Sequence, residues 1–249
     1  MQLHYQTTGE GQPLVLIHGL FGSADNWGII AKHFAQHFQV ISIDLRNHGR
    51  SPHSESQTYA DMADDLLELC NALGLEQVCL LGHSLGGKVA MQFATQYPDR
   101  VSKLIVVDMA MRAYADEHTH LINAMMTVDL SHAESRNDID RELKAPISNL
   151  MVRQFLLTNL VKVEGQLQWR INLPAIKNNY PKFQAALLAH FAKPSLFIRG
   201  ERSHYVNESD VAEIHSQFPN VEIISLPTDH WVHAEQPQLF IQTVGRFLS

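Results

Sequence analysis

The sequence predicts an α/β protein whose sheet is mostly parallel and flanked by helices on both faces. Short apolar runs alternate with amphipathic helical patterns over the first 108 residues, and the alternation resumes after Pro194. The runs are apolar at consecutive positions, which is typical of strands buried on both faces of a parallel sheet. At 249 residues, the chain is long enough to bury a sizeable core.

The part before residue 108 contains four expected strands and three expected helices. Each strand is a continuous apolar run, and the helices carry apolar residues three or four apart, as Trp27, Ile30 and Phe34 do. Gly74 and Pro98 are stop signals for the second and third helices. The expected strands are 13–18, 40–43, 78–81 and 101–107, and the expected helices are 25–38, 58–73 and 85–97.

The pattern changes between about residues 111 and 190, where helical fragments dominate and no strand is expected. Strands 195–199 and 221–226 and helices 209–218 and 238–248 then complete the sheet. No linker-like sequence flanks the changed segment. We therefore expect a single domain over residues 1–249, with a core of about 1–110 and 191–249 and a helical cap of about 111–190.

Composition argues against several classes of partner. The formal net charge is −7 and no block of Lys and Arg occurs, so we expect neither nucleic acid nor an anionic membrane as a partner. No apolar run reaches the roughly 20 residues that span a bilayer, and the first residues do not resemble a secretory signal. The two cysteines, Cys70 and Cys79, lie in a helical and a strand pattern, so we expect a reduced, cytoplasmic protein.

The stretch Gly82-His83-Ser84-Leu85-Gly86 joins an expected strand to an expected helix. A serine in such a sharp turn is the arrangement of a nucleophile elbow, whose strained backbone exposes the hydroxyl. Glycines flank it because side chains there would collide with the adjacent strand and helix. Ser84 is therefore the candidate nucleophile, and a helix-capping serine in a glycine-rich turn is the alternative.

Four motifs in chain order make the sequence similar to the α/β-hydrolase superfamily over nearly its whole length. They are HGLFG at 18–22, DLRNHGRS at 44–51, GHSLG at 82–86 and DHWVHAEQP at 229–237. Their combination is similar to the bacterial YbfF-type esterases and their mitochondrial relatives. The resemblance implies an α/β-hydrolase fold with a helical cap inserted after the sixth strand, and a serine hydrolase that cleaves carboxylic esters.

The resemblance also implies roles for single residues. His230 follows the last expected strand, where the family keeps the histidine that takes the serine proton. The family places the acid after its seventh strand, where this chain has Ser203, or after its sixth, where it has Asp108. We expect Asp108 to orient His230 with help from Ser203. Glu201 is the next candidate acid, and helix capping is the alternative role for Asp108.

The oxyanion formed during acyl transfer needs N–H donors that are fixed in advance. The expected donors are the N–H of Leu85, which follows the candidate nucleophile, and the N–H of Leu20 in the HGLFG loop. Methionines of the cap fit an adaptable acyl pocket and ordinary helix packing equally well. The expected lining residues of the substrate pocket are Phe21, Met125, Phe155 and Trp231.

No metal or cofactor is expected. His33 and His37 have the i, i+4 spacing of a metal site, but they lack a carboxylate or cysteine partner, which favours a solvent-facing helix surface. No glycine loop has P-loop or Rossmann spacing. Lys88, one turn into the helix after Ser84, is expected to carry its ammonium group to solvent.

The sequence thus predicts an esterase for small-molecule esters with small to medium acyl groups, and thioesters are a further substrate class. C–C bond hydrolases and cofactor-free haloperoxidases use the same triad, so the motifs do not separate them from an esterase. A non-catalytic ligand receptor on a hydrolase fold is the alternative from another class. The sequence predicts neither the alcohol group nor the oligomeric state.

Overall fold

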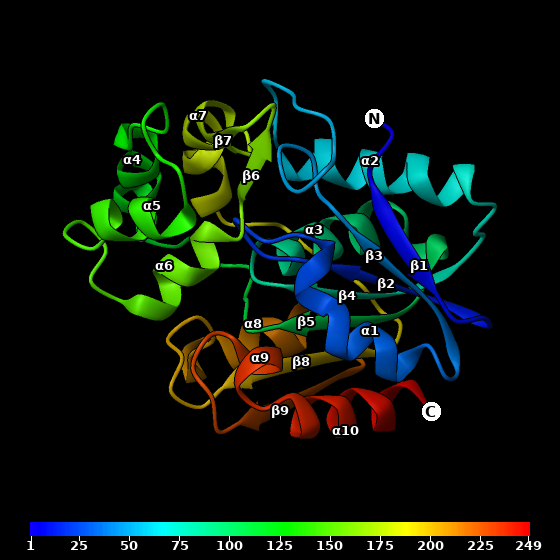
Figure 1. Cartoon of the computed structure of the whole chain (residues 1–249). Coiled ribbons are helices and arrows are strands. Elements are labelled where there is room, and N and C mark those ends of the chain that lie inside the picture. Colours follow the sequence, from blue (N-terminus) through cyan, green and yellow to red (C-terminus); the bar gives the residue numbers. More distant parts are fainter.

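The computed structural model describes all 249 residues and contains a seven-stranded sheet in the order β1-β3-β2-β4-β5-β8-β9 (Figure 1). Neighbouring strands pair in parallel except at the edge, where β1 is antiparallel to β3. The predicted mostly parallel sheet is confirmed, and only β1 was not expected. The strands are β1 Tyr5–Thr8, β2 Gln12–Ile17, β3 Phe38–Ile43, β4 Val78–His83, β5 Val101–Val107, β8 Ser195–Gly200 and β9 Val221–Leu226.

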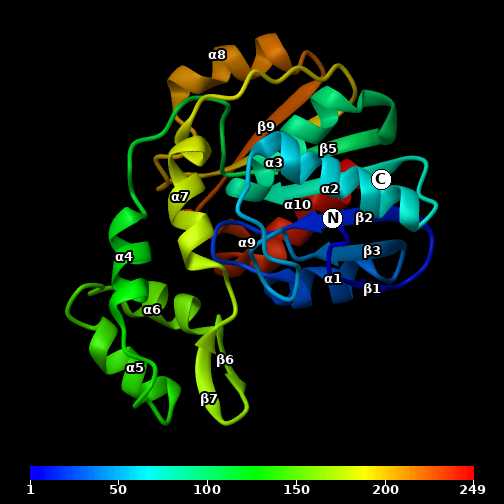
Figure 2. The same cartoon turned by 90° about the horizontal axis from the view of Figure 1, so that it is seen from above.

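Helices cover both faces of this sheet (Figures 1 and 2). Leu14 and Leu16 of β2 belong to the hydrophobic cluster that includes α1 and α10, whereas Val15 and Ile17 belong to the cluster that includes α2, α3 and α8. The alternation follows from the two-residue repeat of a strand and explains why the strands are apolar at consecutive positions. None of the helices has both the length and the apolar character of a membrane span. The helices of these layers are α1 Gly28–Phe34, α2 Tyr59–Ala72, α3 Leu85–Gln96, α8 Glu208–Gln217, α9 Val232–Glu235 and α10 Pro237–Leu248, with short 3-10 helices at Ala24–Trp27 and Pro98–Arg100.

Residues 111–190, which we call the insertion, lie together on one side of the sheet and its helices (Figure 2). The insertion follows β5, the strand that the family counts as its sixth. It contains α4 Thr119–Thr127, α5 Arg136–Leu143, α6 Leu150–Leu157 and α7 Leu173–Gln184.

The expectation that the insertion lacks strands is wrong. β6 (Leu160–Val163) and β7 (Gln166–Trp169) form an antiparallel hairpin. Its two turn residues, Glu164 and Gly165, have φ of 49° and 87°. Two consecutive positive φ angles match the right-handed twist of the flanking strands, which is why such turns favour glycine and close hairpins tightly.

Lys88 holds both ends of the insertion against α3. Its side chain is 1% exposed, so the expectation that the ammonium reaches solvent is wrong. Nζ donates to the carbonyl oxygen of Arg112 at 3.0 Å and to that of Ala185 at 2.6 Å. It also lies 5.7 Å from the ring centroid of Tyr59 and 5.0 Å from that of Tyr114. Burial lowers the pKa of Lys88 to about 8, so the amine remains mostly protonated at neutral pH.

Candidate active site

Ser84 lies in the turn between β4 and α3, at the carboxyl end of the sheet. Its φ of 55° and ψ of −120° fall in a region that residues with a side chain rarely adopt. The Ser84 N–H donates to the carbonyl oxygen of Val107 on β5 at 3.0 Å, which fixes the turn to the neighbouring strand. A Cβ atom on Gly82 would lie 2.1 Å from the oxygen of Gly86, and a Cβ on Gly86 would lie 2.4 Å from the oxygen of Ile17. The flanking glycines therefore permit the close approach of strand and helix.

Asp108 and His230 meet although they are 122 residues apart in the chain. Asp108 directly follows β5 and is fully buried, and His230 lies in the loop between β9 and α9. The Nδ1 of His230 donates to Oδ2 of Asp108 at 2.7 Å, because an ionised carboxylate only accepts. The same Oδ2 accepts from Oγ of Ser203, and Oδ1 accepts from the N–H of Gly200 at 2.9 Å. With the proton on Nδ1, the Nε2 of His230 is left as an acceptor.

Ser84 and Glu201, the other predicted partners of His230, are not hydrogen-bonded to it. No hydrogen bond joins Ser84 to His230 in the structure, although both side chains line the same cavity. Catalytic hydrogen bonds are often long before substrate binds and shorten in the complex. Glu201, the second candidate acid, follows β8 with an exposed side chain.

Two residues without a predicted role also hold His230. The Tyr205 ring stacks on the imidazole with centroids 3.9 Å apart and planes inclined by 20°. The Nε2 of His83 donates to the carbonyl oxygen of His230 at 2.9 Å. Burial, with smaller contributions from His230 and His233, lowers the pKa of His83 well below its ordinary value. A neutral His83 therefore fixes the backbone of the loop that carries His230, and no motif spacing indicates this contact.

Leu20 and Leu85 offer backbone N–H groups beside the candidate nucleophile. Leu85 is the first residue of α3, where helix geometry leaves the N–H without an intrahelical acceptor. The N–H of Leu20 makes no hydrogen bond within the protein. The Leu20 loop is held by His18, whose Nδ1 donates to the oxygen of Gly19 at 2.7 Å and whose Nε2 accepts from the N–H of Leu45 at 3.0 Å. Burial lowers the pKa of His18, so the ring stays neutral and keeps both bonds.

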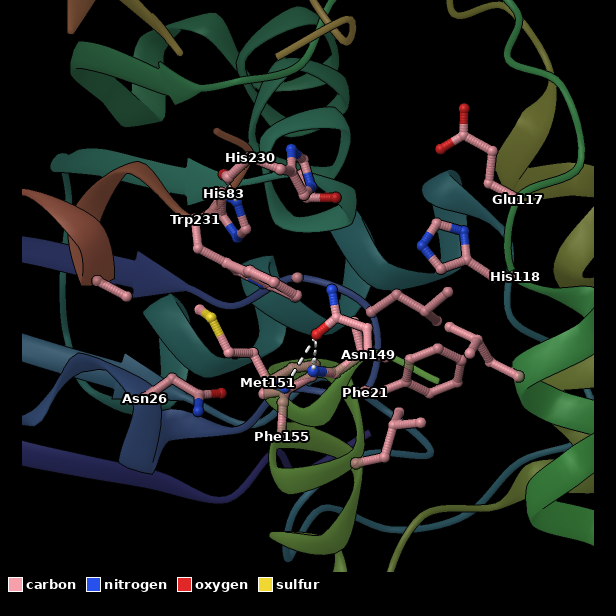
Figure 3. A pocket seen from close by; sticks show the side chains of 18 of the residues that line it. Phe21, Asn26, His83, Glu117, His118, Asn149, Met151, Phe155, His230 and Trp231 are labelled. Atoms are coloured by element: carbon pink, nitrogen blue, oxygen red, sulfur yellow. Dashed lines mark hydrogen bonds between the residues drawn. The ribbon is translucent and has the colours of Figure 1, made fainter. Parts of the chain in front are cut away.

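A cavity of about 720 Å³, which we call the wide cavity, opens between the carboxyl end of the sheet and the insertion. Ser84, His230, Phe21, Phe155 and Trp231 all line it, and the rings of Phe155 and Trp231 lie with centroids 6.0 Å apart. Figure 3 labels Phe21, Phe155 and Trp231 among the side chains that line this cavity.

Positive φ angles gather at this edge of the sheet. Phe21, Ser84 and Asp108 have φ of 62°, 55° and 48°. Such a conformation costs free energy for a residue with a side chain and persists only where the surrounding structure enforces it. Here the enforcing contacts are the bonds of Ser84 and Asp108 to neighbouring strands described above.

Met125 does not line the wide cavity, contrary to the prediction. It is fully buried on α4 beside Ile122, and its carbonyl oxygen accepts from Nε1 of Trp169 at 3.0 Å. Met151 of α6 lines the wide cavity instead and is 61% exposed. Helical periodicity indicates that Met125 faces inward, but it does not indicate which element covers that face.

His118 presents a neutral imidazole to the wide cavity, across from His230 (Figure 3). The hydroxyl of Tyr180 accepts from the N–H groups of Glu117 and His118 at 3.2 and 3.1 Å. Its own hydrogen therefore goes to Nδ1 of His118, 2.9 Å away, and the imidazole proton is on Nε2. Burial, with a smaller contribution from His230, lowers the pKa of His118 to about 4.

Comparison with known proteins identifies the family of this chain. A family model described as "alpha/beta hydrolase fold" matches residues 12–237. The sn-1-specific diacylglycerol lipase ABHD11 of Danio rerio is 40% identical over 257 residues, covering 97% of this chain and 80% of that protein. Esterase YbfF of Escherichia coli is 33% identical over 247 residues, covering 98% and 96%. A solved structure named "Marine microorganism esterase" superposes with a TM-score of 0.96 at 39% identity, covering 99% of both chains. The chain therefore belongs to the α/β-hydrolase family and is an esterase-type enzyme of that family.

Proposed function

We propose that this enzyme hydrolyses carboxylic esters of small to medium acyl groups through an acyl-Ser84 intermediate. The observation that carries the proposal is the 2.7 Å bond between Asp108 and His230, made at the cavity that Ser84 and His230 line. The Nε2 of His230 takes the proton of Ser84 Oγ as that oxygen attacks the ester carbonyl carbon. The N–H groups of Leu20 and Leu85 donate to the resulting oxyanion, each contributing about 3 kcal/mol.

The intermediate collapses when His230 gives this proton to the alkoxide, which leaves as the alcohol. Water then attacks the acyl-enzyme with His230 again as the base, so the carboxylic acid leaves and Ser84 is restored. Asp108 supplies the negative charge that stabilises the imidazolium in both steps. Ser203 donates to the carboxylate, so it helps to hold Asp108 in place but supplies no charge that could stabilise the imidazolium.

Turnover of p-nitrophenyl acetate tests this function against that of a ligand receptor on the same fold. We expect many equivalents of p-nitrophenol per protein molecule at a steady rate, and a fluorophosphonate probe that labels Ser84. A burst of one equivalent followed by no further release would indicate a receptor. A label on another serine would show that the nucleophile is misassigned.

We also propose that the insertion is a cap on one domain whose core is about 1–110 and 191–249. Bonds across the boundary support this. Nδ2 of Asn159 in the insertion donates to the oxygen of Phe21 at 2.8 Å, and the hydroxyl of Tyr59 on α2 donates to the oxygen of Phe183 at 2.7 Å. Thermal unfolding followed by near- and far-ultraviolet circular dichroism should show one coincident transition. Two separate transitions would mean that the insertion folds on its own.

A further inference from the structure

We infer that two spaces around Ser84 divide the ester, a small compartment taking the acyl chain and the wide cavity taking the alcohol. The inference rests on the proposed acyl-Ser84 mechanism and narrows its substrate class. It assigns to this enzyme esters of short acyl groups, of about two to four carbon atoms, with larger and mostly apolar alcohols.

The small compartment is a second pocket that also reaches Ser84. It has a volume of about 50 Å³, compared with about 720 Å³ for the wide cavity. A site needs about 10–15 Å³ to hold one water-sized group, so the small compartment admits roughly three to five such groups, the carbonyl oxygen included. With the ester carbonyl carbon at Ser84, an acyl chain has room for only a few further carbons.

Aromatic side chains form part of the wall of the small compartment. Tyr59, Tyr114, Tyr180 and Phe183 line it together with other residues of the core and the insertion. The hydroxyl of Tyr59 donates to the oxygen of Phe183, and the hydroxyl of Tyr114 donates to the oxygen of Tyr205 at 2.7 Å. Because these hydroxyls are bonded to backbone, the rings are held in place, and a longer acyl chain must displace them.

Proton transfer decides which half of the ester enters which space. The alkoxide oxygen must lie beside Nε2 of His230, since that nitrogen protonates it. His230 and Trp231 line the wide cavity and do not line the small compartment. Leu85, whose N–H donates to the carbonyl oxygen, lines the small compartment and does not line the wide cavity. The alcohol therefore extends into the wide cavity, and the acyl chain extends past Leu85.

The walls of the wide cavity indicate what kind of alcohol it accepts. Phe21, Phe155 and Trp231 present large apolar surfaces there. His118 stands at the boundary, lines both spaces and is held neutral by burial. An uncharged ester with an alkyl or aromatic alcohol fits these walls, because burying a charged group against them without a partner is costly.

Two ester series separate the two halves of the substrate. p-Nitrophenyl esters from acetate to dodecanoate vary the acyl chain, and acetates of ethanol to octanol vary the alcohol. For the unmodified enzyme, kcat/KM should fall at least about tenfold between butyrate and octanoate, because extra methylenes in a filled site are unfavourable. Across the alkyl acetates kcat/KM should stay level or rise. A preference for octanoate or longer acyl chains would overturn the inference.

Two phenylalanine variants then test which wall limits which half. Phe183→Ala should move the acyl optimum to hexanoate or octanoate, and Phe183→Leu should move it less while better preserving the packing. Phe155→Ala, which alters the wide cavity alone, should change the alcohol profile and keep the acyl optimum. An acyl optimum that moves in Phe155→Ala and stays in both Phe183 variants would reverse the assignment. Absence of any ester turnover by the unmodified enzyme would instead contradict the proposed function.

Discussion

Ser84→Ala is expected to lower kcat for p-nitrophenyl acetate by about 10⁶-fold, the size of the loss when a serine protease loses its nucleophile. The covalent route is then closed, and only binding and the oxyanion donors remain. The fold should be retained, because the Ser84 hydroxyl makes no hydrogen bond within the protein, whereas its backbone N–H keeps the bond to Val107. Circular dichroism and the melting temperature show whether the variant keeps its fold. The release of p-nitrophenol by the purified variant gives its kcat.

Contaminating wild-type enzyme is the main error in such a measurement. Titration with the fluorophosphonate probe counts intact sites, so residual rate can be assigned to the variant or to contamination. A correctly folded Ser84→Ala protein that keeps more than about one hundredth of the kcat would show that another group is the nucleophile.

Asp108→Asn is expected to lower kcat by about 10⁴-fold, as in serine proteases with the same change. The N–H of Gly200 donates to Oδ1 in the native protein and would hold the amide oxygen there. The amide NH₂ group then faces Nδ1 of His230 in place of Oδ2. Since two donors cannot pair, His230 must carry its proton on Nε2, which removes the base that Ser84 needs.

Two matched variants isolate the carboxylate charge from the rest of the loop. Ser203→Ala should cost about 10- to 100-fold, because a hydrogen bond to a charged group contributes about 1.5–3 kcal/mol, and this is far less than the loss expected for Asp108→Asn. Glu201→Gln should leave kcat/KM near that of the unmodified enzyme, since its side chain is exposed. All three are compared by kcat/KM at pH 8 with folding checked by circular dichroism. If Asp108→Asn stays within tenfold while Glu201→Gln loses its activity, Asp108 is not the acid.

Part of the candidate site could be predicted from the sequence because its physical causes are local or follow from the strand order. The collision that requires Gly82 is with the backbone of Gly86, four residues away, so five letters of sequence contain it. The collision that requires Gly86 is with Ile17 on β2 and depends on how the strands are ordered in the sheet. The meeting of Asp108 with His230 follows from their places after β5 and β9, because parallel strands end at the same edge of a sheet.

Other features depend on contacts that no short pattern encodes. The stacking of Tyr205 on His230 requires the loop after β8 to pack against the loop after β9. Hydrophobic periodicity does not predict contacts between loops. The sequence places Lys88 on α3 but does not show what covers that helix, so its ammonium was expected in solvent. Its burial depends on the segments around Arg112 and Ala185, about 70 residues apart, which both pack over it. The β6–β7 hairpin is a different case, since Glu164-Gly165 between alternating residues was a readable turn signal.

The positive φ angles of Phe21, Ser84 and Asp108 have a consequence for how this enzyme can be improved. Each such conformation costs on the order of 1–3 kcal/mol, less for an Asp, within a net stability of about 5–15 kcal/mol. A screen that selects only for resistance to heat would favour glycine at these positions, although glycine there removes the proposed nucleophile, the proposed acid or a wall of the wide cavity. Heat resistance and turnover are therefore opposed at this edge of the sheet. Mutations that raise both are to be sought far from it, in the helices that cover the sheet.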